Sequence, residues 1–458
     1  MNVLVLMCDH LRYDAISCHG NPHVRTPNLD RLAARSVRFT NAFCNSPLCG
    51  PTRHSLATGL YPYRHGVVTN SLLPVEGMRT IAHRAVDAGW RAECFGHMHW
   101  QRIDTGDGRP DVFPDHGYQD YQAVHHDRSG LTDAQRRRRM WEELDLTQSR
   151  TAGISAVPGD QFYARQIADA SIRRLRDWAA SGQRFLSWTS FDEPHPPFFT
   201  TRELYNNYAA LDLPPPLTRP DDASPSRDEV GRNPVWNDMT PLDHRVMKAG
   251  YYGLVEMADR QLGRVLDALD ELRLWDSTLV LFTVDHGEML GDFNLYAKSV
   301  MWEQAVHVPF FVCHPGVAPG ERTALAEHVD VLPTICDCLG LPVPEGTQGR
   351  SLKPWLTGAG PASWREYALA HLNELIMVRT ERWKLVYQKG IPAHLFDLRE
   401  DPRESFNRIA DRPDVARGLN ALLERDHPDL LPATRRHVAA DRRRKKKLKP
   451  DVVLAERI

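Results

Sequence analysis

The first candidate for chemistry is a stretch around one cysteine, residues 45–60, in which Cys49 is followed by Gly50, Pro51 and Arg53. Pro51 suits the first turn of a helix, so Cys49 would stand where free backbone N–H groups favour an anion. Arg53, one turn further, would point back to the same place. Taken alone, the pattern is more typical of a buried free cysteine beside a turn, with Arg53 on a solvated face. The other segments of the chain have to decide between these two interpretations of the Cys49 segment.

Four apolar runs that are typical of strands end at residues able to bind a metal or move a proton. The runs are 3–7, 91–95, 185–191 and 278–284, and they are followed by Asp9 with His10, His97 with His99, His195, and Asp285 with His286. Strands alternating with helices indicate a parallel sheet, in which ligands bind beyond the carboxyl ends of the strands. We therefore expect these side chains along one sheet edge.

Asp9 and Asp285 would repel each other at short range, and a divalent cation between them removes that cost. Carboxylate ligands favour Ca²⁺, Mg²⁺ or Mn²⁺, and an added histidine shifts the preference toward Mn²⁺ or another transition metal. The alternative is that both carboxylates cap turns after their strands. Lys298 and Arg53 add positive charge. Together these groups describe a pocket for an ester of a tetrahedral oxyanion, in which cations stabilise developing charge and a histidine protonates the leaving oxygen.

The elements that must position these residues are those of a large α/β domain. The pattern predicts helices near 26–34, 80–89, 161–181 and 242–274, a fifth strand at 308–312, and polar or Pro-rich loops at 101–160 and 204–241. We expect a catalytic α/β domain over residues 1–365 with a large mixed, mostly parallel sheet between helices. Short alternating runs predict a C-terminal subdomain over 366–458, with a small antiparallel sheet and a basic tail.

Composition sets broad limits. The chain has 458 residues, 42% hydrophobic and 25% charged, with a formal net charge of −2, so bulk charge indicates neither a nucleic-acid nor a membrane partner. The N-terminal run has no basic segment or cleavage site and is typical of a first strand. The eight cysteines include no CxxC pair, which argues against a zinc ribbon or a disulfide scaffold. We expect a cytoplasmic protein.

Several segments resemble the sulfatase family. Cys49-Gly-Pro-Thr-Arg53 with Ser55-Leu-Ala-Thr-Gly is similar to the sulfatase signature, and Thr283-Val-Asp-His-Gly-Glu-Met-Leu-Gly291 with Lys298 is similar to a metal motif. Gly96-His-Met-His99 stands in the place of a Gly-Lys-x-His element, and Leu395-Phe-Asp-Leu with Asp401-Pro-Arg-Glu404 resembles a C-terminal segment. The resemblance implies an alkaline-phosphatase-like fold. It also implies that a maturation enzyme oxidises Cys49 to formylglycine, whose hydrate is the nucleophile.

The same resemblance implies a role for each site residue. Asp9, Asp285 and His286 would hold one divalent metal, Ca²⁺ or alternatively Mn²⁺, together with residue 49. Arg53 would hold the nucleophile and His99 would take its proton. His195 and Lys298 would contact the sulfate and the leaving oxygen, and His97 would contribute to substrate binding.

The chain departs from the family pattern at three positions. His10 stands where many sulfatases have a second Asp, His286 where many have Asn, and His97 where a Lys is usual. The first two departures resemble the branch that contains choline sulfatase and phosphonate monoester hydrolases. Whether His10 is a metal ligand is left open.

Three hypotheses follow. The first is a sulfatase that hydrolyses a sulfate ester of a sugar or another small organic molecule. The second is a phosphonate monoester or phosphodiester hydrolase on the same scaffold, since a tetrahedral anion pocket does not distinguish sulfur from phosphorus. The third is a non-catalytic binding protein with an unmodified Cys49. We expect a homo-oligomer with no nucleic-acid partner and no membrane attachment.

Overall fold

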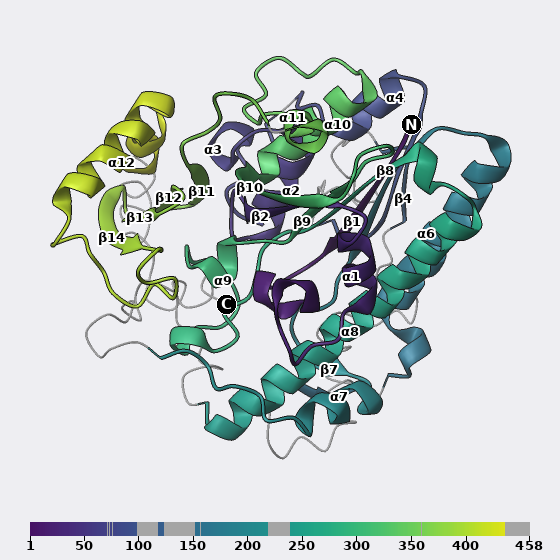
Figure 1. The fold of residues 1–458 in the computed structure, drawn as a ribbon, viewed down its shortest axis with the longest axis horizontal. Helices are drawn as coiled ribbons and strands as arrows, with labels where there is room; N and C mark the ends of the chain where they lie inside the picture. Colours follow the sequence, from purple (N-terminus) through teal and green to yellow (C-terminus); the bar gives the residue numbers. More distant parts are fainter. Residues whose placement is uncertain are drawn as a thin grey trace, which may run out of the picture.

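The computed structural model describes residues 1–70, 72, 74–75, 77–98, 118–122, 152–155, 157–218, 239–358 and 360–435 (Figure 1). His99, most of the predicted 101–160 insertion, residues 219–238 and the basic tail beyond residue 435 lie outside these ranges. Across the described ranges, every helix is too short or too polar to cross a membrane.

A large sheet forms the centre of the molecule. Its strands run in the order β10-β2-β9-β8-β1-β6-β3-β4. Their bounds are β1 Asn2–Cys8, β2 Val37–Phe43, β3 Arg91–Gly96, β4 Asp120–Gln122, β6 Phe185–Phe191, β8 Thr278–Val284, β9 Phe310–Cys313 and β10 Gly320–Glu327. All neighbouring pairs are parallel except the two that involve β9, which runs antiparallel to β8 and β2. The predicted mixed, mostly parallel sheet is confirmed.

The central strands end at one level. Cys8, the last residue of β1, pairs with Phe191 of β6 and Val284 of β8. Beyond them the backbone bonds continue, because the Asp9 N–H donates to the Phe191 carbonyl at 3.1 Å and the Asp285 N–H donates to the Cys8 carbonyl at 3.3 Å. β6 and β8 are buried along their whole length, as expected for strands covered on both faces. This register holds the residues that follow the strands side by side.

Helices cover both faces of the sheet. In Figure 1, α1, α6 and α8 pack together on one side, and α2, α4 and α10 group on the other. The α-helices are α1 Pro27–Ala33, α2 Cys49–Thr58, α3 Pro62–His65, α4 Ile81–Asp87, α6 Tyr163–Ser181, α7 Arg202–Ala209, α8 Pro241–Glu271, α9 Glu303–Val306, α10 Val331–Leu339, α11 Lys353–Thr357 and α12 Pro413–Asp426. Short 3₁₀ turns are η1 Tyr13–Ala15, η2 Ser17–His19, η3 Gly159–Gln161, η5 Trp275–Ser277, η6 Asp292–Asn294 and η7 His328–Asp330.

A smaller antiparallel sheet follows, as predicted. It is built from β11 Ala368–Leu372, β12 Leu375–Arg379, β13 Trp383–Gln388 and β14 Ile391–Asp397, in that order. Its apolar face packs with α12 in a second core, which includes Leu369, Ile376, Leu385, Leu395 and Leu423. A division of the chain at residue 365 stays a prediction. A third, two-stranded sheet pairs β5 Ala152–Ile154 with β7 Phe198–Thr200.

Two sequence-based expectations need correction. The predicted 204–241 loop is wrong at its start, because α7 extends to Ala209. Leu204 and Tyr208 are spaced one helical turn apart and are buried, and the Thr201 hydroxyl accepts the Leu204 N–H at 3.3 Å as an N-cap. β2 and β10 were not anticipated, because both sequences mix charged or polar residues with apolar ones and lack a continuous apolar run.

Candidate active site

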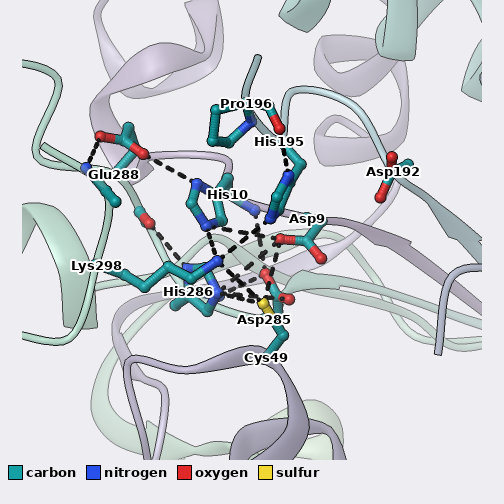
Figure 2. Close-up of polar contacts among 12 residues, drawn as sticks. Asp9, His10, Cys49, Asp192, His195, Pro196, Asp285, His286, Glu288 and Lys298 are labelled. Atoms are coloured by element: carbon teal, nitrogen blue, oxygen red, sulfur yellow. Dashed lines mark hydrogen bonds and ion pairs between the residues drawn. The ribbon is translucent and has the colours of Figure 1, made fainter. Parts of the chain in front are cut away.

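Site residues from four other segments converge on Cys49. Figure 2 shows Asp9 and His10 from the end of β1, His195 from the loop after β6, and Asp285 and His286 from the end of β8. Cys49 is the first residue of α2 and is completely buried. The loop between β8 and α9 brings Lys298 to the same point. The level strand ends described above are the reason that these distant residues meet.

Four of these residues form a candidate metal site. One ligand atom from each of Asp9, Cys49, Asp285 and His286 lies within 4.8 Å of the other three. The His286 ring has Nδ1 at 2.9 Å from the Gly287 carbonyl, so Nδ1 carries the hydrogen and Nε2 presents its lone pair to the cluster. That Nε2 lies 3.1 Å from the Cys49 Sγ. Two carboxylates, one imidazole and the side chain of residue 49 are a donor set that fits a divalent cation.

Arg53 contacts both carboxylates. It is fully buried, and its Nη2 donates to Asp9 at 3.1 Å and to Asp285 at 3.0 Å. Its Nη1 donates to the Ser190 hydroxyl at 2.8 Å and to the His97 carbonyl. Arg53 therefore points back from the first turns of α2 as the sequence predicted, and its hydrogen bonds orient the carboxylates of the candidate metal site.

The electrostatics of the pair favour a bound cation. Burial and the negative charge of Asp9 raise the pKa of Asp285 to about 7. Burial opposes ionisation of Asp9 too, but positive neighbours that include Arg53 and Lys298 hold its pKa well below the usual value. A divalent cation would favour the charged form of both carboxylates.

Lys298 and His195 face residue 49. The Lys298 Nζ lies 3.2 Å from the Cys49 Sγ and 3.4 Å from the His195 Nε2. Burial lowers the pKa of Lys298, but nearby negative charge, which includes Asp9 and Asp285, raises it overall, so the ammonium stays charged. Burial and Asp9 raise the pKa of the Cys49 thiol well above its usual value. The unmodified thiol is thus not activated as a thiolate nucleophile by these residues.

Of the three remaining predicted histidines, the structure places His10 and His97 near Asp9. The His10 Nε2 is 4.0 Å from Asp9, and His10 forms a second possible donor group with Asp9, Cys49 and His195. The His97 Nε2 lies 3.7 Å from Asp9, and burial and Arg53 lower the pKa of His97 to about 3. His97 is therefore neutral at pH 7. His99 lies outside the described residues.

Sequence reasoning missed several residues that shape the site. The Asn70 side-chain oxygen accepts the Gly50 N–H at the start of α2 at 2.8 Å. The Tyr251 hydroxyl from α8 donates to the His10 carbonyl at 2.8 Å. Glu288 accepts from the His10 ring at 2.9 Å. Glu288 belongs to the motif quoted above, which was the one available signal, whereas Asn70 and Tyr251 stand in no recognisable pattern.

This arrangement of a cation site, a helix N-terminus and a half-buried ammonium is typical of metal-dependent hydrolases that act on esters of tetrahedral oxyanions. Comparison with known proteins narrows the class. The sulfatase family model matches residues 1–341, and a model of the C-terminal part of N-sulphoglucosamine sulphohydrolase matches residues 291–426. The chain belongs to the sulfatase family and is a sulfuric ester hydrolase.

Known relatives cover most of the chain. A choline-sulfatase of Rhizobium meliloti is 29% identical over 90% of this chain and 83% of its own. An arylsulfatase of Clostridium perfringens is 28% identical over 89% of this chain and 90% of its own. Among solved structures, the phosphonate monoester hydrolase of Agrobacterium radiobacter superposes with a TM-score of 0.79 at 27% identity, covering 93% of this chain and 95% of that one. The similarity extends across both sheets.

Proposed function

We propose that this chain hydrolyses a sulfate ester of a sugar or another small organic molecule, using formylglycine at position 49 and one divalent metal. The observation that carries the proposal is the meeting of the Asp9, Cys49, Asp285 and His286 donor atoms within 4.8 Å at the start of α2. The raised pKa of the Cys49 thiol supports conversion to a different nucleophile.

Asp9, Asp285 and His286 would hold the metal with residue 49. His10 would be a ligand only if its Nε2 released the Lys298 ammonium that it contacts. The bound cation would supply Lewis-acid stabilisation of charge on the ester. Ca²⁺ fits the two carboxylates, and Mn²⁺ is the alternative because of the imidazole. Metal analysis of the purified protein distinguishes them.

The remaining site residues would act on the ester or on the nucleophile. Lys298 stabilises negative charge on the sulfate and the leaving oxygen from its place beside residue 49. His195, next to Lys298, contacts the same oxygens, and its Nδ1 is anchored at 2.7 Å from the Pro196 carbonyl. Arg53 orients Asp9 and Asp285 and helps to hold the nucleophile. His97 lines the substrate side, and the family resemblance supports His99 as the base that takes the proton of the nucleophile.

The modification is tested by mass spectrometry. The chain is expressed with and without a formylglycine-generating maturation enzyme, and the mass of the peptide that contains residue 49 is measured. We expect the CH₂SH side chain to become an aldehyde, with loss of one sulfur and two hydrogens and gain of one oxygen, only in the co-expressed sample. Only that sample should turn over an aryl sulfate. A persistent thiol together with no turnover would favour the non-catalytic binding protein.

The second candidate is hydrolysis of phosphonate monoesters or phosphodiesters. The 27% identical phosphonate monoester hydrolase with a TM-score of 0.79 favours it. A panel of aryl sulfate, phenylphosphonate and phosphodiester substrates decides between the two. A higher kcat/KM on the phosphonate than on the sulfate would replace the first function by the second.

The proposal also covers the partner, the cellular compartment and the oligomeric state of the enzyme. The maturation enzyme is a required partner. All eight cysteines are free, which supports a reducing compartment, the cytoplasm. A homo-oligomer is proposed, and light scattering of the purified chain measures its mass in solution.

A further inference from the structure

Glu288 is a buried carboxylate that the reaction outlined above does not use. Its residue is 0% exposed, and it follows the candidate ligand His286 by two positions (Figure 2). Its Oε2 lies 2.9 Å from the His10 Nδ1. Its Oε1 accepts the Leu290 N–H at 3.0 Å and also the Ala297 N–H. One carboxylate therefore joins the end of β1 to two points of the loop that carries Lys298.

His10 is held in one orientation from several sides. Its φ of 64° is the left-handed region, which is unfavourable for a residue with a side chain. Its N–H donates to Asp285 at 3.1 Å and its carbonyl accepts the Tyr251 hydroxyl at 2.8 Å. These bonds fix the backbone. The ring itself packs against the rings of His195 and His286, with centroids 4.5 and 4.4 Å away, and its two nitrogens contact Glu288 and one further group.

That group is the Lys298 ammonium, which contacts the His10 Nε2. Because an ammonium only donates, Nε2 must present a lone pair, and Nδ1 must then carry the hydrogen that Glu288 accepts. Glu288 and Lys298 thus select the same tautomer from opposite ends. The chain of contacts runs from Glu288 through His10 to Lys298, and the Lys298 Nζ ends 3.2 Å from the Cys49 Sγ.

The backbone around Lys298 depends on the same carboxylate. Ala297 and Ser299, on either side of Lys298, have φ angles of 62° and 78°. Left-handed conformations at non-glycine residues persist only where surrounding contacts hold them. The bond from the Ala297 N–H to Glu288 is such a contact.

We infer that Glu288 is a positioning residue that aims the Lys298 ammonium at position 49, through the His10 ring and through the Ala297 backbone. The inference rests on the proposed function for the role of Lys298. Three donors converge on Glu288: the His10 ring N–H and the backbone N–H groups of Leu290 and Ala297. Glutamine has the same shape but only one acceptor oxygen, so Glu288→Gln must leave at least one donor facing an NH₂ group.

The first test reads the tautomer and needs no turnover. Full-length protein with unmodified Cys49 and ¹⁵N-labelled histidine is examined by long-range ¹H–¹⁵N NMR, and His10→Gln identifies the His10 signals. We expect a neutral ring with hydrogen on Nδ1. A ring with hydrogen on Nε2 overturns the inference, whether or not the protein proves to be a sulfatase.

The second test is a double-mutant cycle on matured enzyme with aryl sulfate. Glu288→Gln should lower kcat about 10- to 100-fold, the usual cost of losing a partner behind a reacting group, with a much smaller change in KM. In the His10→Gln background the Glu288→Gln penalty should shrink, because one of its two routes to Lys298 is already cut. Equal penalties in both backgrounds contradict a role through His10.

The matched control is Glu256→Gln in α8. Glu256 is also buried and accepts the Tyr208 hydroxyl at 2.6 Å, but it belongs to a network with Arg25 and Arg260 away from residue 49. We expect Glu256→Gln to lower Tm and leave kcat unchanged. If Glu288→Gln lowers Tm as much as the control does and leaves kcat unchanged, Glu288 is only structural. If no ester is turned over by wild type, the proposed function fails and the NMR result alone decides the tautomer that the inference requires.

Discussion

Two buried clusters in this molecule have the same charges and different uses. In the active site, Arg53 bridges Asp9 and Asp285. Where the large sheet meets the small one, Arg365 bridges Glu327 and Asp330. Each cluster has one guanidinium between two carboxylates and is almost fully withdrawn from solvent. Charge and burial alone therefore do not distinguish a reactive cluster from a structural one.

The Arg365 cluster is closed by donors. Each carboxylate oxygen of Glu327 and Asp330 receives an N–H or O–H in addition to the guanidinium contacts. These donors are Asn45 Nδ2 at 3.0 Å, Leu369 N at 2.7 Å, Tyr61 OH at 2.9 Å, Glu327 N at 2.8 Å and Arg350 N at 2.8 Å. A carboxylate supplied with donors in this way has no need of a metal ion.

The Arg53 cluster has an excess of acceptors. Asp285 Oδ1 receives the backbone N–H groups of His10 and His286. Asp9 Oδ1, by contrast, has among the described residues only the Cys49 thiol as a donor, at 3.7 Å. The His286 Nε2 lone pair lies 3.9 Å from the same oxygen. Lone pairs that face one another favour a cation, and this excess of acceptors distinguishes the Arg53 cluster from the Arg365 cluster.

The largest expected effect is on catalysis and comes from Asp285→Asn. Loss of a ligand should remove several kcal/mol of transition-state stabilisation, so kcat/KM on aryl sulfate should fall about 10³-fold or more. The Tm of the metal-free protein should fall only slightly. Relief of the buried charge and of its repulsion with Asp9, which together raise the pKa of Asp285 to about 7, offsets most of the cost of losing an acceptor oxygen for the donors that converge on Asp285. Steady-state kinetics and calorimetry check the two parts.

Glu327→Gln is the matched variant in the closed cluster. It should lower Tm and leave kcat per folded molecule nearly unchanged. If Asp285→Asn lowers the Tm of the metal-free protein as much as Glu327→Gln does, both carboxylates are structural and the contrast between the Arg53 and Arg365 clusters is wrong.

The next effect is on folding and comes from Arg365→Met. Two buried carboxylates would lose their cation, at a cost of about 3–5 kcal/mol. Urea unfolding measures this loss, and divalent cations should not restore it. Arg53→Met should also destabilise the metal-free protein, but Ca²⁺ or Mn²⁺ should recover part of that loss by replacing the missing charge. Equal recovery in both variants would contradict the comparison.

The sequence predicts that the two carboxylates of the Arg53 cluster meet. It does not predict which residues meet in the Arg365 cluster. The runs 185–191 and 278–284 are apolar throughout, and a parallel sheet aligns whatever follows such strands, so the meeting of Asp9 with Asp285 follows from general rules. Arg365 meets Glu327 and Asp330 through packing between two sheets, for which no local pattern exists.

Other parts of the site depend on distant packing in the same way. The Tyr251 hydroxyl reaches His10 across 241 positions of the chain. The apolar character of Phe310–Cys313 suits a parallel or an antiparallel strand equally, so the direction of β9 could not be predicted. Glu288 stands in a recognisable motif, but its use depends on the left-handed turn that brings the Ala297 N–H back to it.

A smaller effect is expected from metal removal. A metal at 100 times its Kd stabilises the folded state by about 3 kcal/mol, so a chelator should lower the Tm of wild type. The chelator should not change the Tm of Asp285→Asn, and Arg365→Met should lose as much as wild type does. A chelator effect that persists in Asp285→Asn would place the stabilising metal elsewhere.

The smallest effect tests whether the closed cluster is held by its individual donors. Tyr61→Phe removes the hydroxyl that donates to Glu327 at 2.9 Å and leaves Arg365 on the same oxygen. A hydrogen bond to a charged group contributes about 2 kcal/mol, and one between neutral groups about 1 kcal/mol. Tyr387→Phe, which loses a bond to the Asn420 side chain, is the neutral reference. Urea unfolding should show the larger loss in Tyr61→Phe, with kcat unchanged in both variants. Equal losses would mean that Arg365 alone holds the Oε2 oxygen of Glu327. At that oxygen the contrast between the two clusters would then rest on the arginine contact and not on the neutral donor.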